Sequence, residues 1–354
     1  MSYSVKSYAA HTSTGRLGPF NFERRSPRPD DVVIEILYCG VCHSDLHNVR
    51  NDWGNAKYPM VPGHEIIGRV VEVGSQVTRF KAGDSVGVGC MVDSCQHCGP
   101  CGKGWEQYCE KGSTYTYNHN DRIDGSRTHG GYSEKIVVKS DFVLKLPDNL
   151  DLAGAAPLLC AGITTFSPLR HWKVGAGSKV AIVGLGGLGH MGLKLAKAMG
   201  AEVTLFSRSP GKETDARRLG ADHIVISTDA AQMAAVAGRF DLIIDTVPYV
   251  HDVNPYVPTL ASGGTIVMVG YLGPLESFNT GPLVYSRKTL AGSLIGGIAE
   301  TQEMLDFCGQ HGITSDIEVI RIQDINEAFE RLLKADVKYR FVIDMASLKE
   351  VVTA

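Results

Sequence analysis

The residues that most clearly indicate chemistry are four cysteines with the spacing Cys-x2-Cys-x2-Cys-x7-Cys, namely Cys95, Cys98, Cys101 and Cys109. Thiolates at this spacing can surround one tetrahedral zinc ion with bonds of about 2.3 Å. Disulfides are the first alternative, but cysteines three positions apart on a short loop are poorly placed to form them. Unrelated buried cysteines are the second, yet Gly99, Gly102 and Gly104 supply the tight turns that a metal cage needs. The spacing therefore predicts a closed, structural zinc site with no position free for a substrate.

A second signal is a glycine-rich segment that matches G-x-G-x-x-G, formed by Gly184, Leu185, Gly186, Gly187, Leu188 and Gly189. It follows the apolar run KVAIV directly and opens GLGHMGLKLAKAMG, in which apolar residues recur at helical spacing. Glycines in this context let the backbone approach a pyrophosphate at a helix N-terminus, where unpaired N–H groups point. Glycine turns are often only turns, but the flanking strand and helix here predict dinucleotide binding.

The end of the next expected strand indicates which dinucleotide is bound. An acidic residue there would accept hydrogen bonds from the ribose 2′-hydroxyl of NAD. This chain instead has Ser207, Arg208 and Ser209, with Lys212 nearby and no carboxylate before Glu213. Hydroxyls and cations suit a 2′-phosphate, which a carboxylate would repel. A solvated helix start is the alternative, although cations there oppose the helix dipole. The pattern favours NADP(H).

Further metal donors are spread along the chain: Cys42 in GVCHSDLH, His64 and Glu65 in VPGHEIIG, and Cys160 in PLLCAGIT. Each alone proves little, because a lone buried cysteine is more often a small hydrophobic residue than a ligand. Two thiolates and one imidazole together form a catalytic type of zinc site, in which the fourth position stays open. The remaining cysteines, Cys39, Cys90 and Cys308, are expected to be structural thiols.

The order of these motifs resembles that of one enzyme family. GVCHSDLH, GHE, the four-cysteine segment, LLCAGIT and GLGGLGH follow one another as in zinc-dependent medium-chain alcohol dehydrogenases. In detail the chain resembles the cinnamyl-alcohol-dehydrogenase branch, particularly its bacterial and fungal NADPH-dependent aldehyde reductases. The resemblance extends essentially from end to end and includes the closing KYRFVIDM.

The resemblance implies roles for the metal donors. Cys42, His64 and Cys160 would bind a catalytic zinc, with Glu65 as a neighbouring or alternating ligand. Asp45 would orient the ring of His64 through a hydrogen bond. With the four-cysteine site, two zinc ions are expected per chain.

The resemblance also implies a proton relay, in which Ser44 and His47 would pass a proton through the nicotinamide ribose to solvent. A hydroxyl can both donate and accept, and an imidazole exchanges protons near neutral pH. An exposed loop histidine is the alternative for His47. The residues expected beside the nicotinamide are Thr164, Val269, Gly270 and Ile295.

The expected substrate pocket includes Trp53, which could equally be a packing residue near Tyr58. Lignin-type members of the family carry an aromatic residue at the position that Thr114 holds here. This departure argues against narrow tuning for coniferyl-type aldehydes and favours a broader pocket for aromatic and medium aliphatic aldehydes.

The secondary-structure elements that must position these residues follow two different patterns along the chain. Residues 32–38, 68–74 and 85–92 are short apolar or alternating runs typical of strands, and the chain is β-rich to about Leu150. DLAGAAPLLCAGITTFSPLRHW is helical in tendency, and Gly154, Pro157 and Gly162 are expected to break it. Strand–helix alternation follows, which predicts a doubly wound parallel sheet.

We therefore expect an α/β protein of two domains. Residues 1–155 and 294–354 would form a GroES-like catalytic domain with a zinc lobe at 93–112, and residues 156–293 a Rossmann domain. The resemblance implies a homodimer joined through the edges of the Rossmann sheets.

The composition argues against a nucleic-acid-binding, membrane-associated or secreted protein. Of 354 residues, 44% are hydrophobic and 21% charged, with a net charge of −3 and nine cysteines. Such a chain shows no bulk attraction to nucleic acid or anionic membrane, no signal-peptide pattern, and a cysteine usage that fits the cytosol.

Three other functions remain open at this level. A polyol or secondary alcohol dehydrogenase would commonly use NAD and an acidic residue at the second strand end. A nucleic-acid-binding zinc ribbon would need a basic patch, yet Lys103 and Lys111 are the only Lys or Arg residues in the cysteine segment. A catalytically silent zinc- and dinucleotide-binding protein would not need the full ligand set.

Overall fold

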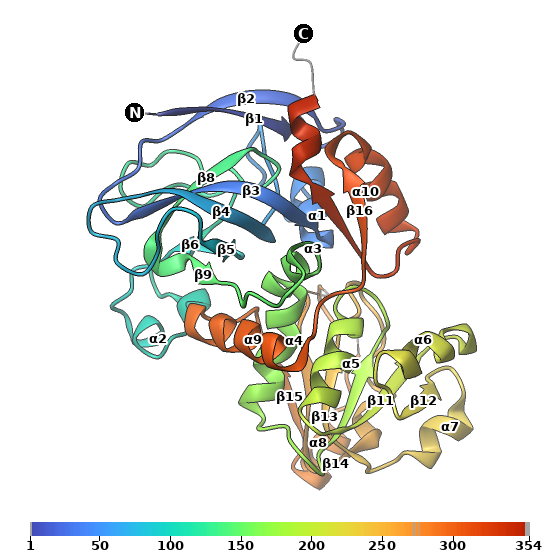
Figure 1. Ribbon diagram of the computed structural model, residues 1–354. Helices are drawn as coiled ribbons and strands as arrows, with labels where there is room; N and C mark the ends of the chain where they lie inside the picture. Colours follow the sequence, from blue (N-terminus) through green and yellow to red (C-terminus); the bar gives the residue numbers. More distant parts are fainter. Residues whose placement is uncertain (1, 272, 276, 351–354) are drawn as a thin grey trace. The chain divides into compact units, whose positions relative to one another are not determined.

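The computed structural model describes residues 2–271, 273–275 and 277–350. It divides into two compact units, Met1–Cys160 with Gly296–Ala354, and Ala161–Ile295 (Figure 1). These junctions lie a few residues beyond the ones expected from the sequence.

The first unit is built on a seven-stranded sheet of order β16-β17-β3-β4-β5-β9, with β8 also paired to β3. Two small antiparallel sheets, β1-β2 and β6-β7, accompany it. The strands of this unit are β1 (Tyr3–Ala9), β2 (Gly18–Arg24), β3 (Asp31–Val41), β4 (Ile66–Val73), β5 (Ser85–Val88), β6 (Met91–Asp93), β7 (Thr114–Tyr115), β8 (Lys135–Lys139), β9 (Leu144–Lys145), β16 (Ile317–Arg321) and β17 (Arg340–Asp344). Its helices are α1 (His43–Arg50), α2 (Gly99–Gly102), α3 (Leu152–Ala155), α9 (Ile298–His311) and α10 (Ile325–Leu333).

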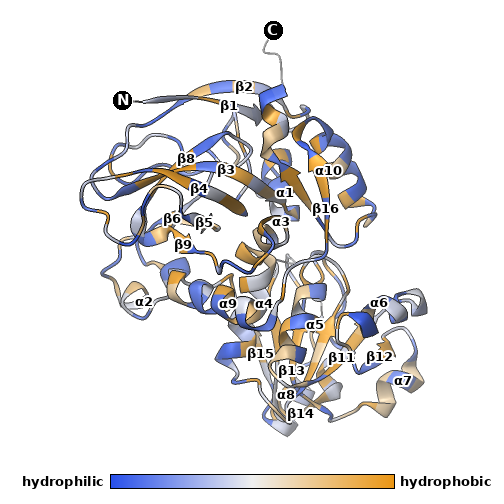
Figure 2. Cartoon of the chain, viewed as in Figure 1, coloured by the Kyte–Doolittle hydropathy of each residue, from blue (hydrophilic) through white to orange (hydrophobic). Residues whose placement is uncertain are grey.

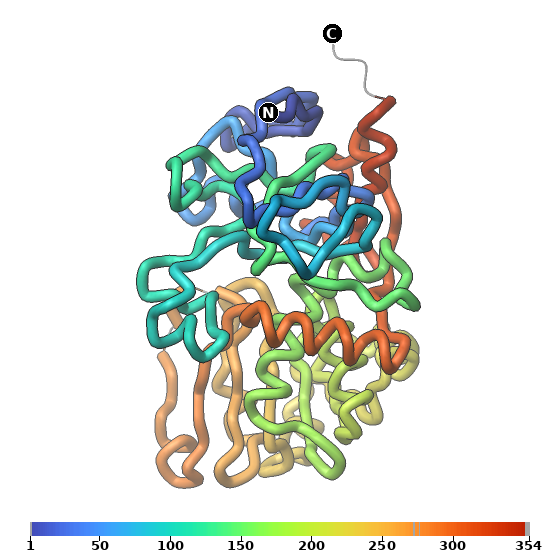
Figure 3. The backbone as a smooth tube through the Cα atoms, turned by 60° about the vertical axis from the view of Figure 1, so that its left-hand side comes forward, coloured from blue at the N-terminus to red at the C-terminus, as the bar shows by residue number. Residues whose placement is uncertain are grey.

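The C-terminal segment returns to the N-terminal one within this unit. Strand β17 pairs antiparallel with β3, so that Phe341 lies opposite Val41 and Ile343 opposite Cys39. Figure 3 shows the red end of the chain beside the blue strands. The pairing matters for the site because it places the first residue of β17, Arg340, next to the end of β3.

The second unit contains a six-stranded parallel sheet of order β12-β11-β10-β13-β14-β15, the order of a doubly wound dinucleotide-binding fold. Its strands are β10 (Lys179–Val183), β11 (Glu202–Ser207), β12 (His223–Ile226), β13 (Phe240–Asp245), β14 (Leu260–Met268) and β15 (Thr289–Gly292). Its helices are α4 (Ala161–His171), α5 (Gly189–Ala198), α6 (Glu213–Arg218), α7 (Ala230–Ala235) and α8 (Gly281–Ser286). The expected α/β fold class is confirmed.

The core of the second unit follows from its apolar strands. Val180, Leu205 and Ile243 are fully buried, as a parallel sheet covered on both faces requires. Figure 2 shows β11 and β13 in the hydrophobic colour. Helix α5 packs on β10 and β11 and also contacts α4.

Two local expectations are wrong. Residues 85–92 do not form one strand, because β5 ends at Val88 and β6 begins at Met91 in a different sheet. Gly162 does not break its helix: the interruption comes at Cys160, and α4 then runs through Gly162 and Pro168. Burial of this helix outweighs the low propensity of both residues.

Within the described residues, no single helix is long and apolar enough to cross a membrane. The bent pair Leu152–Leu159 and Ala161–His171 meets the length and composition test only when taken together.

Candidate active site and metal centres

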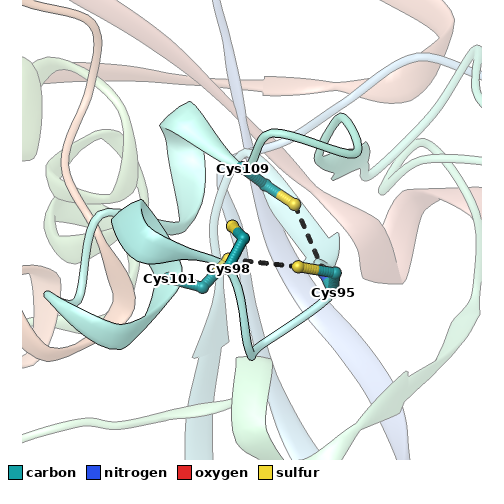
Figure 4. A group of neighbouring side chains, drawn as sticks. All are labelled: Cys95, Cys98, Cys101 and Cys109. Carbon is teal, nitrogen blue, oxygen red and sulfur yellow. Dashed lines mark hydrogen bonds between the residues drawn. The ribbon is translucent and has the colours of Figure 1, made fainter.

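The four-cysteine segment forms a compact thiol cluster. The sulfurs of Cys95, Cys98, Cys101 and Cys109 all lie within 4.8 Å of one another, and all four cysteines are free thiols. Figure 4 shows them converging from the loop before α2, from α2 itself and from the loop after it. The Cys95 and Cys101 sulfurs are 3.9 Å apart. A tetrahedron with bonds of about 2.3 Å has edges of about 3.8 Å, so the cluster fits zinc.

Backbone groups around the cluster favour thiolates. The N–H of Cys95 donates to the sulfur of Cys109 over 3.4 Å, and the N–H of Glu110 donates to the sulfur of Cys98 over 3.5 Å. The pKa of Cys95 is lowered to about 6, first by a hydrogen bond from the backbone of His97. The thiolate is the form that binds metal.

The lobe is attached to helix α9 by close backbone packing. Glu106 Oε2 accepts a hydrogen bond of 3.0 Å from the N–H of Ile298, in the first turn of α9, where a carboxylate complements the helix dipole. Gly297 leaves no room for a side chain, because a Cβ there would lie 1.7 Å from the carbonyl oxygen of Gly104. A structural role for the lobe is consistent with this attachment.

A second cluster brings together donors that are far apart in the sequence. One ligand atom each from Cys42, His64, Glu65 and Cys160 lies within 4.8 Å of the others, and all four residues are buried. The sulfurs of Cys42 and Cys160 are 3.9 Å apart, again close to the edge of a zinc tetrahedron. Cys42 precedes α1, His64 and Glu65 precede β4, and Cys160 lies just before α4. The two clusters share no residue.

Asp45 orients the second cluster through hydrogen bonds. It is fully buried and accepts three hydrogen bonds of 3.0 Å, from the N–H groups of Cys42 and Gly63 and from Nδ1 of His64. Because Nδ1 keeps its proton and donates it in the hydrogen bond to the carboxylate, Nε2 of His64 is the nitrogen left to bind a metal. The bond to the N–H of Cys42 also caps the start of α1.

Arg340 is a site residue that the sequence reading missed. It is 2% exposed and forms a buried ion pair with Glu65, while its Nη1 lies 3.9 Å from the sulfur of Cys42. Burial raises the pKa of Glu65 to about 7, against the lowering influence of Arg340. The other oxygen of Glu65, Oε2, is buried without a hydrogen-bond partner, which is the situation a cation would relieve. An arginine within the apolar run YRFVID was the signal for a buried acidic partner.

Ser44 and His47 both lie in α1, on the turn that follows Cys42. The hydroxyl of Ser44 is 3.7 Å from the sulfur of Cys42, so it borders the second cluster. His47 Nδ1 is 2.7 Å from a carboxylate oxygen of Asp52, a partner that the sequence reading did not identify. The ring of Trp53 lies 5.7 Å from that of His47, between centroids.

The other expected pocket residue lies elsewhere. Thr114 is buried in β7 and lines a cavity with Asp93 and Asp121, whose lining contains none of the four ligands of the second cluster. The aromatic ring beside the cluster is Tyr117, 6.0 Å from the ring of His64. Cys90, expected to be a structural thiol, donates a hydrogen bond of 3.8 Å to the carbonyl oxygen of Leu159, and the neighbouring thiol of Cys160 lowers the pKa of Cys90.

The glycine-rich turn of the second unit has the geometry that its sequence predicts. Gly184 has φ +89°, a conformation that favours glycine. A Cβ at Gly189 would lie 2.0 Å from the carbonyl oxygen of Gly184, so only glycine permits this turn. Gly186, Gly187 and Leu188 complete the turn, and α5 begins at Gly189.

The end of β11 presents cationic and hydroxyl groups beside this turn. Ser207 Oγ donates to the carbonyl of Ser209 over 2.8 Å, and Lys212 Nζ donates to the carbonyl of Leu185 over 3.1 Å. Burial, and then the nearby Arg208, lowers the pKa of Lys212. The two cations therefore lie close enough to repel each other, which an anion between them would offset.

The residues expected near the nicotinamide all lie in the second unit. Thr164 is buried in α4, and Val269 and Gly270 follow the carboxyl end of β14. Ile295 is 9% exposed and has φ +37°. Their contact with a cofactor stays a prediction.

Comparison with known proteins agrees with this geometry. Two family models match, the alcohol dehydrogenase GroES-like domain at residues 28–148 and the zinc-binding dehydrogenase domain at residues 187–310. Aldehyde reductase YahK from Escherichia coli is 53% identical over 348 residues, which cover 98% of this chain and 99% of that protein. The chain belongs to the zinc-dependent medium-chain alcohol dehydrogenases.

Solved structures place it within the family. A cinnamyl alcohol dehydrogenase from Sorghum bicolor is 48% identical, with a TM-score of 0.95 over 99% of this chain and 100% of that one. The cinnamyl alcohol dehydrogenase of Helicobacter pylori, solved with NADP(H), is 42% identical, with a TM-score of 0.91 over 98% and 99% of the two chains. The expected membership of the cinnamyl-alcohol-dehydrogenase-like branch is confirmed.

Proposed function

We propose that this dehydrogenase transfers hydride between NADP(H) and aldehydes or primary alcohols, mainly as a broad reductase of aromatic and medium aliphatic aldehydes. The observation that carries the proposal is the buried set of Cys42, His64 and Cys160, a donor set that leaves a zinc position open. The names of relatives support it, since one is an aldehyde reductase and another an NADP-dependent alcohol dehydrogenase.

The residues of the first unit divide the work of this reaction. Bound zinc supplies Lewis acidity toward the carbonyl oxygen, which stabilises the negative charge that develops as hydride arrives. Two thiolates and a neutral imidazole leave the donor set with about the charge needed to balance the metal. Asp45 maintains the neutral tautomer of His64 that presents Nε2. Arg340 balances the charge of Glu65, which we propose as the neighbouring or alternating ligand.

Proton delivery is assigned to α1. The hydroxyl of Ser44 gives a proton to the oxygen of the reduced substrate, since it can accept a replacement at the same time. His47 would supply that replacement, by way of the nicotinamide ribose when the cofactor is bound. Its Nδ1–H donates to Asp52, which leaves Nε2 as the position that gains and loses the transferred proton.

NADP(H) is the proposed cofactor, with its pyrophosphate at the N-terminus of α5 and its 2′-phosphate between Arg208 and Lys212. Both cations, with Ser207 and Ser209, stand where an NAD enzyme carries a carboxylate. Thr164, Val269, Gly270 and Ile295 are the proposed nicotinamide contacts.

Trp53 is the proposed substrate-contacting aromatic residue, because it adjoins the relay residue His47 and is 43% exposed. The placement of Thr114 in a separate cavity argues against its direct contact with substrate. The proposed breadth toward aldehydes therefore does not rest on Thr114.

We further propose a cytoplasmic homodimer. None of the nine cysteines forms a disulfide in the described structure, which suits a reducing compartment. Strand β15 ends the six-stranded sheet, and pairing of two such edges would extend the sheet across a twofold axis. Light scattering on the purified protein tests the mass of the assembly.

The experiment that tests the function measures kcat/KM for benzaldehyde, cinnamaldehyde and butanal with NADPH and with NADH, in the wild type and in Arg208→Ala. We expect a preference for NADPH that falls roughly 10- to 100-fold in the variant, because a hydrogen bond to a charged group is worth about 1.5–3 kcal/mol. Arg217→Ala is the matched control, since Arg217 lies on an exposed surface and hydrogen-bonds the side chain of Glu213 and the carbonyl oxygen of Asp222.

Two results would overturn the proposal. An NADPH preference unchanged in Arg208→Ala contradicts the cofactor assignment. One zinc per chain instead of two, measured by atomic emission on active protein, contradicts the mechanism.

A further inference from the structure

The strand ends beside the glycine-rich turn carry a set of contacts that the sequence did not suggest. In the parallel sheet, β10 lies between β11 and β13, and Val183 is in register with both Phe206 and Asp245. The carboxyl ends of β11 and β13 therefore flank the start of the turn. Across two strand spacings of about 4.8 Å each, a long side chain from one end can reach the other.

Arg208, just after β11, makes this contact with Tyr249 in the loop after β13. Its Nη2 donates a hydrogen bond of 2.8 Å to the hydroxyl of Tyr249, and its guanidinium carbon lies 5.7 Å from the ring centroid. A free arginine side chain has about 2 kcal/mol of rotamer entropy to lose when it binds an anion. Tyr249 removes part of that loss in advance and occupies only one of the five N–H donors.

Tyr249 is in turn held by its own loop. His251 Nδ1 lies 2.9 Å from the carbonyl oxygen of Tyr249, and His251 Nε2 lies 2.8 Å from Oδ2 of Asp245. Both partners are acceptors, so the ring must carry both protons and a positive charge. The raised pKa of His251, caused first by the hydrogen bond with Asp245, agrees with this geometry.

Asp245 anchors the set to the sheet. It is 1% exposed at the end of β13, and its other oxygen accepts a hydrogen bond of 3.1 Å from the N–H of Val247. Strand β13 thus fixes the position of the Arg208 side chain, because Asp245 holds His251, His251 holds the backbone of Tyr249, and Tyr249 holds Arg208.

We propose that Tyr249 and His251 are positioning residues that set the selectivity for NADP(H) over NAD(H), by holding Arg208 where the 2′-phosphate binds. The proposal rests on the function proposed above. The hydroxyl of Tyr249 and the imidazole of His251 thus contribute to the choice of cofactor without touching the reacting atoms. The N–H donors of Arg208 that face away from Tyr249 stay available to the phosphate.

The test compares binding of two adenosine fragments by isothermal titration calorimetry: 2′,5′-ADP, which carries the 2′-phosphate, and 5′-AMP, which lacks it. The Tyr249→Phe substitution removes the hydroxyl and keeps the ring. We expect its Kd for 2′,5′-ADP to rise about 3- to 10-fold, the effect of one lost hydrogen bond, while its Kd for 5′-AMP stays within twofold. His251→Phe is expected to act in the same direction.

Kinetics and a double-mutant cycle separate positioning from a general effect on the loop. KM for NADPH should rise in Tyr249→Phe, while kcat and KM for NADH stay unchanged. In an Arg208→Ala background the effect of Tyr249→Phe should disappear, because the hydroxyl acts only through Arg208. Tyr285→Phe, at an exposed tyrosine in α8, is the matched control and should leave both fragments unaffected.

The outcomes distinguish this proposal from the one on which it rests. If the wild type binds both fragments equally and Arg208→Ala changes nothing, the NADP(H) assignment fails. If Arg208→Ala loses 2′,5′-ADP while Tyr249→Phe binds it as the wild type does, only the positioning role fails. Equal weakening of both fragments by Tyr249→Phe also refutes selectivity and leaves a purely structural role.

Discussion

Replacing Asp45 by asparagine tests how the second cluster holds its metal. The carboxylate of Asp45 is fully buried and accepts hydrogen bonds from Cys42 N, Gly63 N and His64 Nδ1. An asparagine amide has one oxygen and one NH2 group. If its oxygen faces Gly63 and His64, the NH2 group points at the N–H of Cys42, and that bond is lost. In the opposite orientation two bonds are lost.

The magnitude follows from this count. The better orientation loses one hydrogen bond to a charged group, about 1.5–3 kcal/mol, and turns two others into weaker neutral bonds. The free energy of unfolding should therefore fall by about 3 kcal/mol. Groups that orient a metal-binding histidine typically change metal affinity or activity about 10- to 100-fold, or about 1.4–2.7 kcal/mol. We expect zinc affinity at this cluster to fall within that range.

The assay is competition with a chromogenic zinc chelator, followed by steady-state kinetics with excess zinc. Asp45→Asn should release one zinc per chain at a chelator concentration that leaves the wild type with two, because the four-cysteine site is separate. Asp84→Asn, which changes a partly exposed aspartate paired with Lys81, is the control. Zinc affinity and kcat/KM in Asp45→Asn that stay within twofold of the wild type would refute the orienting role.

Three further predictions concern the lobe and the stability of the first unit. Cys98→Ser should reduce zinc from two to one per chain and lower the thermal unfolding temperature, measured by emission spectroscopy and calorimetry; a stable variant that is merely slow would mean that the two metal sites are assigned the wrong way round. Gly297→Ala should cost roughly 3 kcal/mol of unfolding free energy in a denaturant titration, since the new Cβ would meet Gly104, whereas Gly102→Ala, with open space around it, should stay within about 0.5 kcal/mol. Burial first, and then Arg24 and Arg127, lower the pKa of His129 to about 3. Between about pH 6.5 and pH 3, the histidine therefore binds a proton in the unfolded state but not in the folded state. Stability should thus fall as the pH is lowered through this window, by about 2 kcal/mol at pH 5, and a His129→Gln variant whose acid sensitivity equals that of the wild type would contradict this.

Much of the site could be predicted because its signals are local. The four lobe cysteines and the glycine-rich turn each lie within one short segment, where spacing and glycine conformations largely determine the geometry. The same is true of Asp45, which reaches the N–H of Cys42 three positions away. Breaks within helices were harder, since the burial of α4 overrides the weak propensities of Gly162 and Pro168.

Residues whose role depends on distant partners were missed. Arg340 is separated from Glu65 by 275 positions, and only the pairing of β17 with β3 brings it to the cluster. Tyr249 and Arg208 are 41 positions apart in the sequence. They meet because β11 and β13, which precede Arg208 and Tyr249, are the two neighbours of β10 in the sheet. Thr114 shows the converse. Its position in the sequence suggested a substrate-pocket residue, but strand β7 places it in the lining of a different cavity.

The sequence by itself determined which chemical groups this protein has and which family it resembles. These groups are a set of four thiols, a second set of two thiols and an imidazole, a phosphate-binding turn, and a strand end without a carboxylate. Only the tertiary structure decided which of those groups meet. Cys42 and Cys160 are 118 positions apart, and their sulfurs come within 3.9 Å through long-range strand pairing and burial, which no local pattern specifies. The same packing supplied the partners that tune the donors, Arg340 for Glu65 and Tyr249 for Arg208. Donor identity is a property of single residues, whereas pKa, orientation and selectivity are properties of their neighbours.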